Sequence, residues 1–239
     1  MKFDIYSLTR SQYETLSNPE CIFLVQMLHF LNEIWIVQKT YLISQNGLKE
    51  KEGTVQGAQI AQSFFFIKIL AGILYEAWRV IEQSYGTLDR QHSYNIPQAS
   101  RDALADLKRH FSNSRNIVKY VRQKHSFHCD KDRVNEGIKS VSKQDDFEIL
   151  LSQDGNYFCQ LSETIINASI LEFTKAESYK HALEIVYKDI VDVANWVTNF
   201  AHGFCDAIFA RLGAKVRKET IPGIKKIKDL DVSYFAELD

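Results

Sequence analysis

The chain has 239 residues, of which 45% are hydrophobic, 12% aromatic and 25% charged, a balance typical of a globular protein with a sizeable core. Its formal net charge of −1 excludes a globally basic nucleic-acid binder but leaves a local basic patch open. Ten glycines and three prolines are few, and scarce helix breakers favour a helical protein.

The spacing of the cysteines and the start of the sequence indicate the cellular compartment. The cysteines, at 21, 129, 159 and 205, show no paired spacing, and the first twenty residues contain no apolar run. We therefore expect free thiols in a cytoplasmic protein without a secretory signal. The best candidate for a membrane span is residues 63–81, but Lys68, Glu76 and Arg79 interrupt it. A buried core helix is the better interpretation, and no membrane partner is expected.

Two long helices are predicted in the first third of the chain. Asn18-Pro19 suits a helix start, and the helix should run to about Leu42. Its apolar face at helical spacing consists of Cys21, Leu24, Val25, Leu28, Leu31, Trp35 and Tyr41. Thr54 is expected to cap a second helix, apolar nearly all round near Phe64, that Gly86 ends.

Shorter elements should follow. A polar link over 88–97 precedes a helix over 101–111 capped by Ser100, then helices over 113–125 and up to about Val141. Asp154-Gly155 between apolar, aromatic-rich runs predicts a β-hairpin over about 147–161 that leans on the helices.

The last third is predicted to be one long helix and a tail. Helical periodicity extends from about Thr174 to Leu212, where Gly213 ends the helix. The lysine-rich tail over 213–239 is expected to be solvated. No repeat or long linker divides the chain, so residues 1–239 are predicted to form a single all-α helical bundle with long antiparallel helices and one inserted β-hairpin.

The helix over 113–125 should be amphipathic. Val118, Val121 and His125 lie on one face, and the basic residues Arg115, Lys119 and Arg122 lie on another. Residues 101–143 contain eleven Lys or Arg and five acids, which gives a local net charge of +6. Such a region suits a phosphate backbone, and the alternative is a solvated helix face whose acidic partners lie elsewhere in the fold.

Arg122 and His128 could cleave a phosphodiester without a metal. Arginine keeps its charge near neutral pH, whereas histidine exchanges a proton there. Six residues along a continuous helix would place the two side chains on different faces. The helix must therefore end near Ser126 if His128 is to return beside Arg122.

This segment resembles a known signature. Val121-Arg122-Gln123-Lys124-His125-Ser126-Phe127-His128-Cys129-Asp130 is similar to the Arg-polar-x(3–5)-His motif of HEPN domains, in the abortive-infection-associated branch. The resemblance implies an all-α bundle with the activity of a metal-independent endoribonuclease of toxin–antitoxin or phage-defence type. It implies RNA as substrate, a homodimer whose two motifs share one cleft, and an antitoxin or regulatory protein as a possible partner.

The resemblance also implies roles for single residues. Arg122 would hold the scissile phosphate, and His128 would move the proton of the attacking 2′-hydroxyl or of the leaving oxygen. Gln123, where the family more often has Asn, Asp or His, and His125 would support them. The residues expected to contact RNA are Arg115, Lys119 and Lys124.

Other interpretations of these residues remain. His125, His128, Cys129 and Asp130 could ligate a metal, but no second Cys/His pair completes a zinc site, so neither a metal nor a cofactor is expected. The bundle could instead be a non-catalytic RNA-binding or protein-interaction module, or a purely structural dimer. The remaining histidines are expected in the core or an interface (His29, His181, His202) or at the surface (His110).

Overall fold

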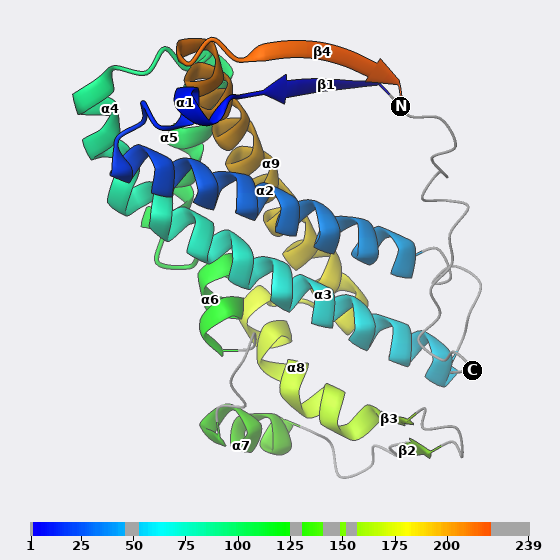
Figure 1. Ribbon diagram of the computed structural model, residues 1–239. Coiled ribbons are helices and arrows are strands. Elements are labelled where there is room, and N and C mark those ends of the chain that lie inside the picture. The colour runs from blue at the N-terminus through cyan, green and yellow to red at the C-terminus, as the bar shows by residue number, and fades with distance from the viewer. Residues whose placement is uncertain (1, 46–52, 125–130, 141–148, 152–156, 221–239) are drawn as a thin grey trace. The chain divides into compact units, whose positions relative to one another are not determined.

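A computed structural model describes residues 2–45, 53–124, 131–140, 149–151 and 157–220. The described chain is mostly helical, with two small antiparallel sheets of two strands each, so the predicted all-α character is confirmed (Figure 1). Its helices are α1 (Arg10–Tyr13), α2 (Asn18–Ser44), α3 (Gly53–Val80), η1 (Ile81–Tyr85), α4 (Gly86–His92), α5 (Gln98–Ser112), α6 (Ile117–Lys124), α7 (Lys131–Ser140), α8 (Gln160–Thr174) and α9 (Tyr179–Arg211).

The chain divides into two compact units. Among the described residues, the first unit contains 2–35, 73–116 and 192–220, and the second contains 36–45, 53–72, 117–124, 131–140, 149–151 and 157–191. Helices α2, α3 and α9 each contribute a segment to both units. The expectation of one domain stays a prediction.

The core of the first unit is aromatic. Phe204 of α9 meets Phe23 of α2 edge to face, with ring centroids 4.8 Å apart, and meets Tyr94 at 5.1 Å. Tyr85 packs in the same way on Phe200, at 4.8 Å. Edge-to-face pairs add to the free energy of burial because the positive ring edge meets the negative ring face.

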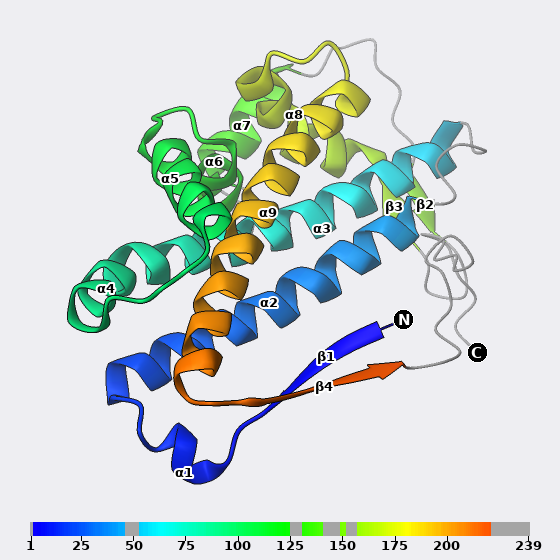
Figure 2. The ribbon, with the colours of Figure 1, turned by 90° about the horizontal axis from the view of Figure 1, so that it is seen from above.

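The basic tail contains a strand that the sequence did not predict. Residues Lys215–Thr220 form β4, which pairs antiparallel with β1 (Lys2–Ser7), and Figure 2 shows the two strands side by side. This stretch is exposed to solvent, as expected of the tail, but it forms a strand that pairs with β1. Residues 221–239 lie outside the described part of the chain. Gly213 does end α9, with a left-handed φ of 64°, as expected.

Gly86 does not end the second long helix. The helical path continues from α3 through the π-helical turn η1 into α4, where Gly86 has an ordinary helical φ of −61°. The helix stops at Ser93, whose φ is 48°. The predicted polar link contains buried apolar side chains, since Leu88, Tyr94 and Ile96 lie in the core. These residues explain why the chain stays packed beyond the glycine.

The sequence predicted Ser100 as the cap of α5, and this prediction is wrong. Helix α5 begins two residues earlier, at Gln98, and Ser100 is buried. Its hydroxyl donates to the carbonyl oxygen of Asn199 in α9, at 2.8 Å. Ala103 and Leu107 of α5 are buried in the core.

The second unit contains the predicted hairpin and one unpredicted helix. Strands β2 (Ile149–Leu151) and β3 (Tyr157–Cys159) pair antiparallel, and Phe158 points into the core. Helix α8 follows directly and packs closely on α7, since a Cβ added to Gly137 would lie 2.3 Å from the carbonyl oxygen of Ile165. The single long helix predicted from Thr174 is therefore α9 alone, which begins at Tyr179.

Helix α2 meets the length and composition expected of a membrane span, as a core helix of a soluble protein or a signal sequence also does. Its most apolar 18-residue window is 28% buried. Part of the predicted apolar face is in the core, namely Leu24, Leu31 and Tyr41. Cys21 is half-buried, and Val25, Leu28 and Trp35 are exposed. The predicted apolar face of α2 therefore lies partly in the core and partly at the surface of the protein.

His29, His181 and His202, expected in the core or an interface, are exposed at the surface of their helices. They are not in the core, and whether they lie at an interface stays a prediction. His110, expected at the surface, is half-buried between Phe111 and Trp196, and burial lowers the pKa of its imidazole. Among the described cysteines, Cys21, Cys159 and Cys205 are free thiols, as expected.

Candidate functional site

Helix α6 carries the basic face that the sequence predicted. Val118 and Val121 are buried, whereas Lys119 and Gln123 are exposed. Arg122 is half-buried, as is Lys124. The helix is therefore amphipathic, with a core side and a side that presents positive charge.

Helix α6 is fixed on α8 by one aromatic residue. Tyr120 stacks on Phe173, with ring centroids 3.8 Å apart and planes 10° from parallel. The Tyr120 hydroxyl also donates to the carbonyl oxygen of Ser169, at 3.1 Å. Stacking and hydrogen bond together fix the rotation of α6, and this sets which residues face outward.

The helix begins later than predicted. It starts at Ile117 rather than near Asn113, because Asn116 turns inward and its Nδ2 donates to the His110 carbonyl oxygen, at 3.0 Å. Arg115, which precedes the helix, is exposed and belongs to the first unit. Its backbone N–H donates to Asn113 Oδ1 at 2.9 Å, so it belongs to a turn and not to the basic helix face.

The described residues include one half of the predicted catalytic pair. Arg122 lies in the last described turn of α6, which the structure describes as far as Lys124. His125 and His128 lie outside the described residues, as do Cys129 and Asp130. The convergence of Arg122 and His128 therefore stays a prediction. In the part of the chain that the structure describes, no group of three or more His, Cys, Asp or Glu side chains could hold a metal ion.

A buried ionic cluster in the first unit was not predicted. Glu20, in the first turn of α2, is 2% exposed, and its Oε1 accepts from the Tyr94 hydroxyl at 2.6 Å and from the Arg211 guanidinium. Its Oε2 accepts from the Ser17 backbone N–H at 3.0 Å and from the Ser17 hydroxyl at 2.9 Å. His92 Nε2 lies 3.5 Å from the same oxygen.

These hydrogen bonds keep the buried carboxyl ionised. Burial alone would raise the pKa of Glu20, but the hydrogen bonds from Tyr94, Ser17 and Arg211 outweigh burial and hold it at about 2. Burial and the bond to Glu20 raise the pKa of Tyr94, so its hydroxyl stays a donor. Both carboxylate oxygens are occupied by protein donors, and the cluster therefore fastens the ends of α2, α4 and α9 rather than offering a free base.

One sequence signal pointed to part of this cluster. Ser17-x-x-Glu20 before an apolar run is a capping-box pattern, in which the glutamate reaches back to the backbone N–H of the serine. The contact to Ser17 follows that pattern. The partners Tyr94 and Arg211 are far away in the sequence, and no local pattern points to them.

Comparisons with protein-family models, with curated proteins and with solved structures find no match to this chain.

Proposed function

We propose that this protein is a metal-independent endoribonuclease of the HEPN type, acting through Arg122 and His128. The observation that carries the proposal is the amphipathic helix α6, which is held on α8 by Tyr120 and presents Lys119 and Arg122 outside its buried side. A positively charged helix face attracts a phosphate backbone. The histidine that follows α6 in the sequence would supply the proton transfer that a phosphodiester cleavage needs.

The roles follow from the chemistry of the two side chains. The guanidinium of Arg122 would bind two oxygens of the scissile phosphate and stabilise the charge that grows on them. The imidazole of His128 would accept or return the proton of the reacting hydroxyl. Lys119 and Lys124 would hold the neighbouring phosphates, with Gln123 and His125 in support.

Cleavage of RNA in the presence of EDTA tests this function. We expect Arg122→Ala and His128→Ala each to lower the rate of cleavage by about 10²- to 10⁴-fold, since each removes one catalytic contribution. Matched controls are Arg79→Ala and His181→Ala, two exposed side chains in other helices whose loss should leave the rate unchanged. Rates are measured with a labelled RNA by gel electrophoresis.

The same assay distinguishes the alternatives. Cleavage that EDTA abolishes would contradict the metal-independent mechanism. RNA binding without cleavage, weakened by Lys119→Glu, would instead identify a non-catalytic RNA-binding module. The rate should follow a bell-shaped pH profile if histidines act as acid and base, and a flat profile from about pH 5 to 9 would contradict that chemistry.

We further propose that the active form is a homodimer, with α2 contributing to the interface. Ile22, Val25 and Trp35 of α2 are each about half exposed, at 51%, 52% and 49%. Large apolar side chains left exposed along one helix are typical of an interface. Any antitoxin or regulatory protein would act on this dimer.

Light scattering after size-exclusion chromatography measures the dimer. We expect Val25→Glu to shift the mass from dimer to monomer, because it places a charge within the apolar surface of α2. Lys188→Glu, at an exposed polar position of α9 outside this surface, should leave the dimer intact. A monomeric wild-type chain, or one that binds lipid vesicles through α2, would contradict this interface.

A further inference from the structure

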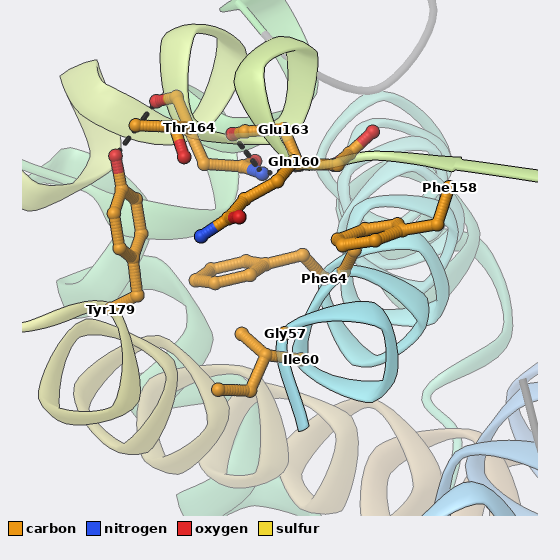
Figure 3. Close-up of a pocket in the computed structure, with 10 residues that line it drawn as sticks. Gly57, Ile60, Phe64, Phe158, Gln160, Glu163, Thr164 and Tyr179 are labelled. Atoms are coloured by element: carbon orange, nitrogen blue, oxygen red, sulfur yellow. Dashed lines mark hydrogen bonds between the residues drawn. The ribbon is translucent and has the colours of Figure 1, made fainter. Parts of the chain in front are cut away.

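The residues that line a small cavity in the second unit favour one chemical class of ligand. It has a volume of about 100 Å³ and lies where α3, β3, α8 and the start of α9 meet (Figure 3). In this view the rings of Phe158 and Tyr179 lie on opposite sides and the ring of Phe64 lies between them. Phe64 and Phe158 are almost fully buried, so the cavity has firm aromatic walls.

The polar wall of the cavity comes from α8 and includes Gln160, Glu163 and Asn167. Asn167 is 2% exposed, and its Nδ2 donates to the carbonyl oxygen of Glu163 at 2.8 Å and to the Glu163 carboxylate at 3.1 Å. Its Oδ1 is buried and has no hydrogen-bond partner. That oxygen is closed off from the cavity as well, so the charged acceptor that this wall offers is the partly exposed carboxylate of Glu163.

The charge in the cavity has one sign. Glu163 lines it, and none of the ten lining residues that the structure describes is a lysine, arginine or histidine. The faces of aromatic rings carry partial negative charge and attract cations. The Tyr179 hydroxyl is already bound as a donor to the Thr164 carbonyl oxygen, at 2.7 Å, so Tyr179 offers its ring rather than its O–H. The cavity therefore favours a cation that carries N–H donors and a small apolar body.

We propose that this cavity binds a primary alkylammonium group. The ammonium donates to the Glu163 carboxylate, and the methylene groups lie against the rings of Phe64, Phe158 and Tyr179. A neutral molecule of the same shape lacks the charge, and an anion is repelled by Glu163. This binding site is independent of the proposed RNA cleavage, because it shares no residue with the basic face of α6.

Calorimetric titration of the full chain with propylammonium chloride tests the proposal. We expect a dissociation constant on the order of 1 mM, at least ten-fold tighter than for 1-propanol or for propionate at equal ionic strength. Glu163→Gln should weaken propylammonium binding at least ten-fold. The matched control is Glu172→Gln, an exposed carboxylate on the same helix, which should bind as the wild type does.

A second variant fills the cavity without disturbing the fold. A Cβ added to Gly57 would meet the Phe158 ring at 3.7 Å, which is ordinary van der Waals contact. Gly57→Ala should therefore fold normally and lose propylammonium binding, because the methyl group takes up part of the cavity. Equal binding of propylammonium and propanol would overturn the proposal, as would binding that survives both Gly57→Ala and Glu163→Gln, or no binding by the wild type.

Discussion

Replacing Glu20 with glutamine should lower the free energy of unfolding at neutral pH by roughly 2 to 3 kcal/mol. The wild-type carboxylate is buried and accepts from Tyr94, Ser17 and Arg211, which hold its pKa at about 2. Glutamine replaces one of the two acceptor oxygens with an N–H₂ group, which is itself a donor. This group would face the donors of Tyr94 and Arg211 or those of Ser17, so these hydrogen bonds would be lost. The figure allows for the part of Arg211 that faces water, where solvent screens its charge.

The pH dependence identifies the charge as the cause. A carboxyl whose pKa is lower in the folded than in the unfolded chain stabilises the fold at higher pH and loses this effect as the pH falls. The gap between wild type and Glu20→Gln should therefore be constant above about pH 5 and shrink from about pH 4.5 to 2. Denaturant unfolding followed by circular dichroism at several pH values measures it.

Glu14→Gln is the matched control for this substitution. Glu14 forms an exposed i,i+4 pair with Arg10, at 2.7 Å, and such pairs contribute only about 0.5 kcal/mol or less. A gap for Glu20→Gln that stays the same down to pH 3 would mean that hydrogen-bond geometry, and not ionisation, determines the loss.

Local patterns predicted the elements whose stability is local. Helix α2 and helix α5 have apolar residues at helical spacing, and the hairpin has Asp154-Gly155 between two apolar runs. Helix α8 was missed because β-branched residues such as Thr164, Ile165 and Ile166 have low helix propensity. Its contacts with α6 and α7 depend on residues distant in sequence, and no local pattern shows them.

Two further misses have the same origin. Strand β4 is exposed along its whole length and rich in charge, so its sequence is indistinguishable from a solvated tail. It is a strand because β1, at the other end of the sequence, supplies the hydrogen bonds. Gly86 was predicted to end a helix because glycine has low helix propensity, but the buried side chain of Leu88 beyond it favours continuation.

The candidate site was predicted in part. The period of α6 gave its buried and basic faces, because both depend only on residues within one helix. The exact start of that helix depends on Asn116 and the His110 carbonyl, a side-chain contact that periodicity does not encode. The Glu20 cluster joins three separate segments, and only its capping-box portion has a sequence signature.

Replacing Gly203 with alanine should destabilise the first unit by about 2 kcal/mol, although alanine is the better helix former. Gly203 lies in α9 where the start of α5 crosses it. A Cβ there would lie 2.0 Å from Ser100 Oγ, 2.7 Å from Ser100 Cβ and 3.1 Å from Pro97 Cδ. The helices would have to separate, and the bond from Ser100 to the Asn199 carbonyl oxygen would lengthen or break.

A double-mutant cycle tests whether Ser100 is the cause. Ser100→Gly removes the two nearest of the three atoms that the new methyl group would meet, so it should recover at least about 1 kcal/mol of the loss in the Gly203→Ala background. Gly86→Ala is the control, because nothing lies within 4 Å of its added Cβ and its φ is helical; it should raise stability by up to about 1 kcal/mol. If Gly203→Ala lowers the free energy of unfolding and Gly86→Ala raises it, the loss is due to the α5–α9 contact. If Gly203→Ala instead raises the free energy of unfolding, the two helices separate at little cost.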